Sequence, residues 1–96
     1  MFTMKMEFDP EKLAKDPDLD NELVMEWLDT ICEDTYFEKI GKGEYKLKEN
    51  EEPIGALVVL ISRFRKQSWL LQNLKTWKTF DDEEGESDTL KAVLED

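Results

Sequence analysis

Apolar side chains occupy every second position over residues 2–8, and polar side chains stand between them. A period of two is typical of a β-strand that buries one face. Residues 44–49 alternate in the same way, so they predict a second strand that pairs with the first. Two strands alone are only marginally stable in water, and this short sheet is therefore expected to pack on helices.

A helical pattern follows the first strand. Asp9 and Pro10 provide an N-cap and a favourable first residue for a short helix, which Pro17 ends. A longer helix is expected from about Asp18 or Asp20, because four apolar residues beyond them keep the i, i+3, i+4, i+7 spacing of one buried stripe. These four residues are Val24, Trp27, Leu28 and Ile31.

Thr35 and Glu38 have the spacing of a capping box, which predicts a further helical turn that Gly41 ends. Apolar residues return at helical spacing over residues 53–80. Because this stretch is longer than an ordinary helix, it predicts one helix with a kink in its middle or two helices of about 13 residues. The branched residues of 56–62 leave a buried strand as the alternative for that part.

Residues 81–86 have the composition of an acidic, solvated linker, and Ser87 is a suitable cap for a short C-terminal helix. The whole pattern predicts a small single α+β domain over residues 1–96, with three to five helices and a short two-stranded β element. An all-α bundle is the alternative.

Charge is distributed unevenly along the chain, which has 24 acidic and 13 basic residues and a net charge of −11. Residues 53–80 hold five basic side chains and no carboxylate, so they carry +5, whereas residues 1–52 carry −9 and residues 81–96 carry −7. Such blocks attract one another within a fold, or they present a surface of one sign to a partner.

The chain lacks the residues on which most catalytic and metal sites depend. It has no histidine, which is the commonest general acid and base near neutral pH and the commonest metal ligand. Its single cysteine, Cys32, is followed by Glu33 and Asp34, whose charges raise a thiol pKa. None of its four glycines lies in a phosphate-binding motif. We therefore expect a protein with no catalytic residues, no metal and no cofactor.

No stretch of the sequence approaches the roughly 18 apolar residues that cross a membrane. The N-terminal residues lack the continuous apolar region of a secretory signal peptide. A lone cysteine forms no internal disulfide, which fits a reducing compartment. We expect a soluble, cytoplasmic protein that does not bind membranes.

Four carboxylates lie within about 60° of one another on the long helix expected after Asp20, on the side away from its apolar stripe. We name them the acidic ridge, and they are Glu22, Glu26, Asp29 and Glu33. No basic residue stands three or four positions after any of them, so their potentials add. Their axial steps of about 4.5–6 Å match the spacing of nucleic-acid phosphates within a factor of two. The alternative is that this is merely the charged outer face of a helix in an acidic protein.

A second candidate surface mixes basic and aromatic side chains, as proteins that bind nucleic acids do. It consists of Arg63, Arg65, Lys66 and Trp69. The net charge of −11 repels DNA and RNA, so we expect no direct nucleic-acid binding. This surface is the alternative site for a protein partner.

These features predict a non-enzymatic acidic protein that blocks a basic surface of another protein, such as a nuclease or another nucleic-acid-binding protein. Immunity proteins against nuclease toxins and phage-encoded nucleic-acid mimics share its small size, high acidity and lack of a cofactor, which is a likeness of composition alone. The alternative function is a structural or regulatory subunit that docks through the aromatic and basic face of residues 53–80.

Overall fold

Five antiparallel strands form one sheet in the computed structural model, which describes residues 1–16 and 18–95. The strands are β1 (Phe2–Phe8), β2 (Phe37–Gly41), β3 (Glu44–Leu47), β4 (Leu74–Asp81) and β5 (Gly85–Asp88). Their order across the sheet is β2-β3-β1-β4-β5. The first strand of the chain is therefore the central strand, with β3 on one side and β4 on the other.

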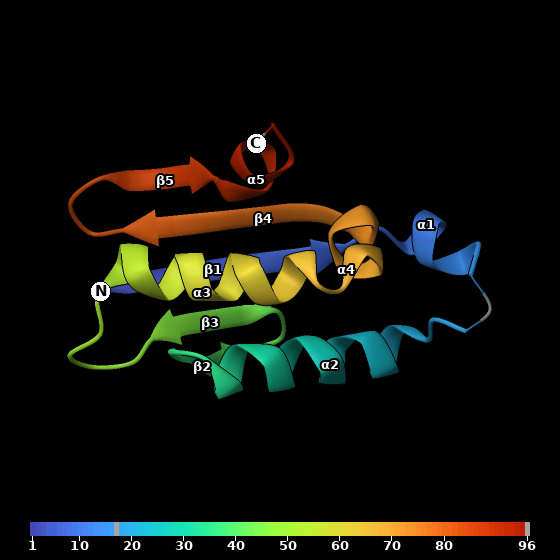
Figure 1. Ribbon diagram of the computed structural model, residues 1–96, viewed down its shortest axis with the longest axis horizontal. Coiled ribbons are helices and arrows are strands. Elements are labelled where there is room, and N and C mark those ends of the chain that lie inside the picture. The colour runs from blue at the N-terminus through green and yellow to red at the C-terminus, as the bar shows by residue number, and fades with distance from the viewer. Residues whose placement is uncertain (17, 96) are drawn as a thin grey trace.

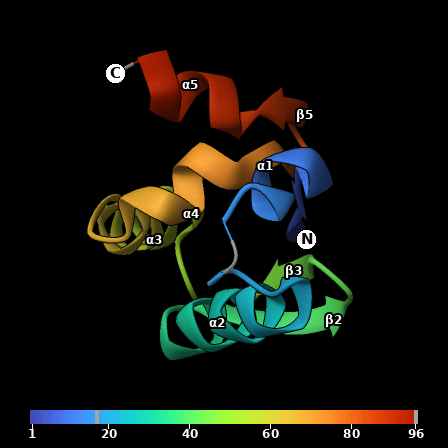
Figure 2. The ribbon, with the colours of Figure 1, turned by 90° about the vertical axis from the view of Figure 1, so that its right-hand side faces the viewer.

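Five helices accompany the sheet. They are α1 (Pro10–Ala14), α2 (Asn21–Asp34), α3 (Pro53–Arg65), α4 (Ser68–Asn73) and α5 (Thr89–Glu95). Figure 1 shows α3 crossing over β1 and α2 running beside β2 and β3. The view along the strands in Figure 2 places α2 and α3 on the same side of the sheet. The shortest helix, α1, follows β1 directly, and α5 packs beside β4 at the sheet edge.

The core lies between the sheet and these helices. Met4 and Met6 of β1 point into it, and the polar residues between them face the other side of the sheet. This alternation confirms the strand predicted from the period of two. The rings of Phe64 on α3 and Trp77 on β4 contact each other edge to face, with their centroids 5.1 Å apart. Leu28 of α2 is fully buried, as its place in the apolar stripe predicts.

The predicted short two-stranded element is wrong, because the sheet has five strands. One error lies at Thr35, which was expected to start a helical turn. Instead Thr35 ends α2: its backbone N–H and its hydroxyl both donate to the Cys32 carbonyl oxygen, the hydroxyl at 2.8 Å. Because α2 ends before it, Phe37 is free to extend the chain as a strand, and it is the buried first residue of β2. The capping-box spacing of Thr35 and Glu38 is therefore coincidental.

A second error concerns the end of the stretch 53–80, which was expected to be helical. Helical structure stops at Asn73, and the chain continues as β4 beside the central strand. Trp77 and Thr79 of β4 lie opposite Met6 and Met4 of β1. Threonine and aromatic residues favour a pleated, half-buried position, and the edge of β1 supplies the hydrogen-bond partners. Residues 56–62 are helical, so the alternative of a buried strand there is wrong.

Residues 81–86, expected as an acidic linker, form the end of β4, the turn and the start of β5. Gly85 takes a positive φ of 81° in this hairpin. After β5 the chain enters α5, where the Asp88 carboxylate accepts a hydrogen bond from the Lys91 backbone N–H at 3.1 Å. None of the helices in the described part of the chain is long and apolar enough to cross a membrane.

Candidate protein-binding surface

The helix α2 determines which way the acidic ridge points. Asp20 caps its N-terminus by accepting a hydrogen bond from the Glu22 backbone N–H at 3.0 Å. Its buried residues are Val24, Leu28, Ile31 and Cys32. Trp27, expected in the apolar stripe, is 46% exposed, because the buried face of α2 is shifted round the helix toward Cys32. Because the buried stripe faces the sheet, the opposite side of α2 faces solvent.

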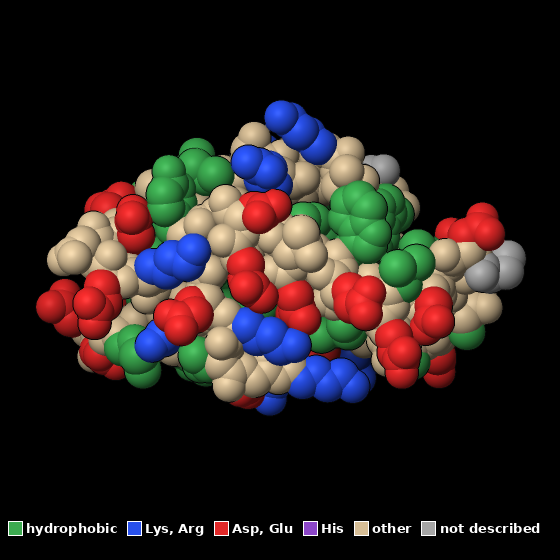
Figure 3. Space-filling model, turned by 90° about the horizontal axis from the view of Figure 1, so that it is seen from below, with side chains coloured by type: hydrophobic (Ala, Val, Ile, Leu, Met, Phe, Trp, Pro, Cys, Tyr) green, Lys and Arg blue, Asp and Glu red, His purple; other side chains and the backbone are tan. Residues whose placement is uncertain are grey.

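Three ridge residues, Glu22, Glu26 and Glu33, are exposed. Figure 3 looks at this side of the molecule, where acidic side chains are spread widely and some basic side chains stand between them. Residues 16–38 contain nine carboxylates and no lysine or arginine. Any basic side chain near the ridge therefore comes from another element.

Asp29, the fourth ridge residue, faces the sheet. Its side chain is only 19% exposed, and it accepts a hydrogen bond from Lys39 Nζ at 2.8 Å. Its other oxygen accepts a hydrogen bond from the Tyr45 hydroxyl. Lys39 belongs to β2 and Tyr45 to β3, so Asp29 attaches α2 to both strands of this hairpin. Its carboxylate holds the helix in place and is not part of the outward surface.

Asp29 contributes to the raised pKa values of both of its hydrogen-bond donors. The hydrogen bond and the charge of Asp29 raise the pKa of Lys39 above its ordinary value. Burial, and then the hydrogen bond to Asp29, raise the pKa of Tyr45 well above that of a free tyrosine. Both groups therefore keep their protons at neutral pH, and both donate to the carboxylate.

Further lysines border the ridge on the side of the β2–β3 hairpin. Lys48 Nζ donates a hydrogen bond to the backbone carbonyl oxygen of Glu33 at 3.2 Å. Lys39 and Lys42 line a shallow hollow together with Glu22 and Glu26. The potential of the ridge is thus partly compensated on this side, which helical spacing alone did not predict.

On its other side the ridge borders exposed apolar side chains. Leu23 is 47% exposed and Trp27 is 46% exposed, and the two lie one helical turn apart. The rings of Trp27 and of Trp69 from α4 also contact each other edge to face, at a centroid distance of 6.2 Å. Sequence reasoning missed this exposure, although the spacing of residues 23 and 27 already puts them on one side of the helix. The outward side of α2 therefore presents carboxylates and an exposed tryptophan next to each other.

Cys32 has no accessible chemistry. Its thiol is fully buried, and burial, followed by the charges of Asp29 and Glu33, raises its pKa far above the ordinary value. The thiolate needed for a nucleophile is therefore scarce at neutral pH. Across residues 1–16 and 18–95, no group of three or more cysteine or carboxylate side chains is placed to hold a metal ion.

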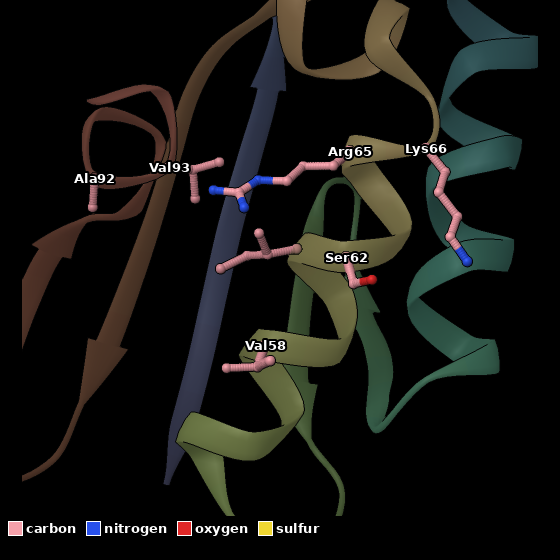
Figure 4. Close-up of a pocket in the computed structure, with 7 residues that line it drawn as sticks. Val58, Ser62, Arg65, Lys66, Ala92 and Val93 are labelled. Atoms are coloured by element: carbon pink, nitrogen blue, oxygen red, sulfur yellow. The ribbon is translucent and has the colours of Figure 1, made fainter. Parts of the chain in front are cut away.

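The alternative site does not form one face. Arg63, Arg65 and Lys66 are exposed on or just after α3, whereas Trp69 is partly buried on α4. Figure 4 shows the side chains of Arg65 and Lys66 pointing in different directions, the first toward α5 and the second toward α2. Trp69 Nε1 donates to the Gln67 side chain at 3.1 Å. Arg65 therefore lies on the side of α5, whereas Lys66 and Trp69 lie on the side of α2.

Comparison with protein-family models, with curated proteins and with solved structures found no match for this chain. The function has to be inferred from the side chains themselves.

Proposed function

We propose that this protein is a non-enzymatic acidic binding protein that covers a basic surface of another protein. The observation that carries the proposal is the outward side of α2, where Glu22, Glu26 and Glu33 are exposed beside Leu23 and Trp27. The partner class that fits is a nuclease or another nucleic-acid-binding protein, because such proteins hold phosphates with clustered lysine and arginine side chains.

The charge of the chain supports this partner class. A net charge of −11 on 96 residues attracts a cationic surface over a distance, and the ridge directs that attraction to one side of α2. Complementary charge of this kind raises the rate of association more than the final affinity.

The exposed Trp27 can contribute binding free energy that the glutamates do not provide. Charged pairs at the rim of an interface contribute little affinity each, whereas tryptophan is enriched among the few residues that dominate binding energy. Trp27 rests against Trp69 at its edge, so its position is defined before a partner arrives. The surface of α2 therefore combines long-range attraction with one apolar anchor.

The test removes the three exposed charges without changing side-chain shape, in the variant E22Q/E26Q/E33Q. A matched control, E49Q/E83Q/E84Q, removes three exposed charges elsewhere and changes the net charge equally. Each protein is immobilised and used to capture proteins from a lysate of the source organism at about 50 and 500 mM salt, and the captured partner is then studied by surface plasmon resonance.

The wild type and the control are expected to capture a basic nucleic-acid-binding protein at low salt and to lose it at high salt. For the ridge variant we expect a slower association rate by about tenfold or more and a flatter salt dependence, with an unchanged circular dichroism spectrum. Equal association rates for the ridge variant and the wild type across the salt series would contradict the proposal, as would capture of acidic proteins only.

A further inference from the structure

A groove runs between α3 and α5, on a part of the surface separate from the acidic ridge. Its apolar walls are Val58 and Ile61 of α3 and Ala92 and Val93 of α5. Figure 4 shows the side chain of Arg65 extending from α3 across this groove toward Val93. Two helices therefore frame a shallow apolar surface that carries a positive charge.

The wall formed by α3 exposes apolar side chains to solvent. Ile54 is 72% exposed and Val58 is 61% exposed, and with Ile61 and Arg65 they follow the spacing i, i+4, i+7, i+11. These residues form one stripe along the helix of roughly 16 Å. A continuous exposed apolar stripe of this kind marks an interaction surface more often than an isolated exposed residue does.

The charge around the groove is opposite to that of the rest of the protein. Acidic residues make up 24 of the 96 residues, yet none of the described side chains that line the groove is a carboxylate. Arg65 and Lys66 are the charged residues of its lining, and it is Arg65 whose side chain extends across the groove, whereas Lys66 points toward α2. A guanidinium group has five N–H donors, so Arg65 can bind a partner's carboxylate while keeping another contact.

We propose that this groove binds an amphipathic helical segment of another protein, with leucine, isoleucine or phenylalanine side chains on one face and aspartate or glutamate side chains flanking them. The apolar face would lie on Val58 and Ile61, and the flanking carboxylates would meet Arg65. Grooves between two helices commonly receive a helix whose anchors repeat every three or four residues. This surface is distinct from the ridge and takes a partner of the opposite charge.

The net charge of −11 does not prevent this binding. At physiological salt, charges separated by more than about 8 Å are largely screened from one another. An approaching acidic segment is therefore attracted mainly by the local charge of the groove. Repulsion by the carboxylates on α2 is strong only at low salt. Binding to the groove should accordingly be measured at about 0.15 M salt or above.

The test is a selection from a displayed library of random peptides of about 16 residues, long enough to match the stripe as a helix. Peptides are selected on the wild-type protein after removal of those that bind the variant Val58→Glu, which places a carboxylate in the groove. Val59→Glu is the matched control, because Val59 is the next residue of α3, is 36% exposed and does not line the groove.

The enriched peptides are expected to be amphipathic and acidic. Measured by fluorescence anisotropy, their affinity should fall about tenfold or more with Val58→Glu, which is at least 1.4 kcal/mol, and change less than about twofold with Val59→Glu or with the ridge variant E22Q/E26Q/E33Q. Replacing the glutamates of the peptide by glutamine should weaken binding several-fold. If Val58→Glu fails to fold, Ala92→Glu serves in its place, because Ala92 is exposed and lines the groove from α5.

Several outcomes would overturn the proposal. They are enrichment of basic peptides, no enrichment over the counter-selection, or equal binding by the wild type and Val58→Glu. A wild-type dimer in sedimentation equilibrium that Val58→Glu makes monomeric would instead assign the groove to a second copy of this chain. Because the ridge variant keeps the groove, failure of this proposal and failure of the proposed function are distinguishable.

Discussion

Asp29 holds α2 on the sheet through two hydrogen bonds that depend on protonated donors. One donor is Lys39 Nζ at 2.8 Å, and the other is the hydroxyl of the buried Tyr45. A buried hydroxyl without a hydrogen-bond partner lowers folding stability by about 1–3 kcal/mol. The Asp29 carboxylate therefore stabilises the fold by accepting the hydrogen bond of Tyr45. This contact belongs to the fold, and it fixes how the three outer glutamates are presented.

The free energy of unfolding should therefore fall at alkaline pH. The folded state raises the pKa of Lys39, Tyr45 and Cys32, so it holds three protons that the unfolded chain releases, the thiol proton above about pH 8.5 and the other two above about pH 10. The stabilisation is fully present below about pH 8.5 and is lost progressively as pH rises from there toward the raised pKa values of the folded state. Urea denaturation between pH 8 and pH 11 measures this loss.

Tyr45→Phe is the control for this pH dependence. It should cost about 1 kcal/mol at pH 8, because one hydrogen bond to Asp29 is lost. It should also reduce the fall in stability above about pH 10, since one of the three groups with a raised pKa is gone. An identical alkaline loss in Tyr45→Phe and the wild type would show that Tyr45 does not contribute to it.

Cys32 should be inert in the folded protein. Its thiol is buried, and its raised pKa leaves almost no thiolate at pH 8. Labelling by iodoacetamide at pH 8 should therefore proceed only as fast as the protein unfolds, and urea should accelerate it strongly. Fast labelling of the native protein would show that α2 opens locally or that the thiol is exposed.

At the scale of elements, local patterns predicted the helices and the strands β1 and β3 with their pairing, but not the full sheet. The period of two in β1 and the apolar stripe of α2 are each complete within a few residues, so the sequence shows them directly. By contrast, β4 is a strand because it lies along β1, more than 60 residues earlier in the chain. The sequence pattern of residues 74–81 does not indicate this pairing, because the spacing of their apolar residues also fits a helix.

The β2–β3 hairpin depends on Gly43. This residue has a φ of +71°, and a Cβ atom placed on it would lie 2.4 Å from the backbone oxygen of Met6. Its carbonyl oxygen accepts a hydrogen bond from the Met6 N–H at 2.8 Å, which ties the turn to the central strand. Gly85 has a similar φ of +81°, but open space surrounds it.

Gly43→Ala should therefore be more destabilising than Gly85→Ala. A left-handed alanine costs roughly 1–2 kcal/mol, which is the whole cost expected at position 85. At position 43 the backbone must also move, and the hydrogen bond to Met6 is strained. Urea denaturation of both variants measures the difference. Equal losses of stability would show that the hairpin adjusts without cost.

At the scale of the whole molecule, the sequence predicted part of the candidate site. The outward direction of Glu22, Glu26 and Glu33 follows from the helix itself, and the structure places all three on the exposed side. The inward contact of Asp29 was not predictable, because its lysine lies ten residues away on a strand that the pattern did not show. The contact of Trp27 with Trp69 likewise depends on how α4 packs beside α2.

The net charge of −11 should make folding stability and partner binding respond to salt with opposite signs. Most ion pairs of the described residues join exposed side chains, several at 3.7–3.9 Å, and such pairs contribute about 0–1 kcal/mol each. Repulsion among the excess carboxylates therefore dominates, and salt screens it. We expect the melting temperature to rise by several degrees between about 10 mM and 0.5 M sodium chloride, since 1 kcal/mol corresponds to about 4–8 °C for a domain of this size.

The charge-reduced control E49Q/E83Q/E84Q should show a smaller rise over the same range, because it has three fewer charges to screen. Capture of a basic partner should weaken over that range, because the attraction to the acidic ridge is screened as well. A melting temperature that falls with salt would show that attractive pairs, such as Lys39 with Asp29, outweigh the repulsion. In that case the negative charge of the ridge would be largely neutralised within the fold, and the case for a cationic partner would fail with it.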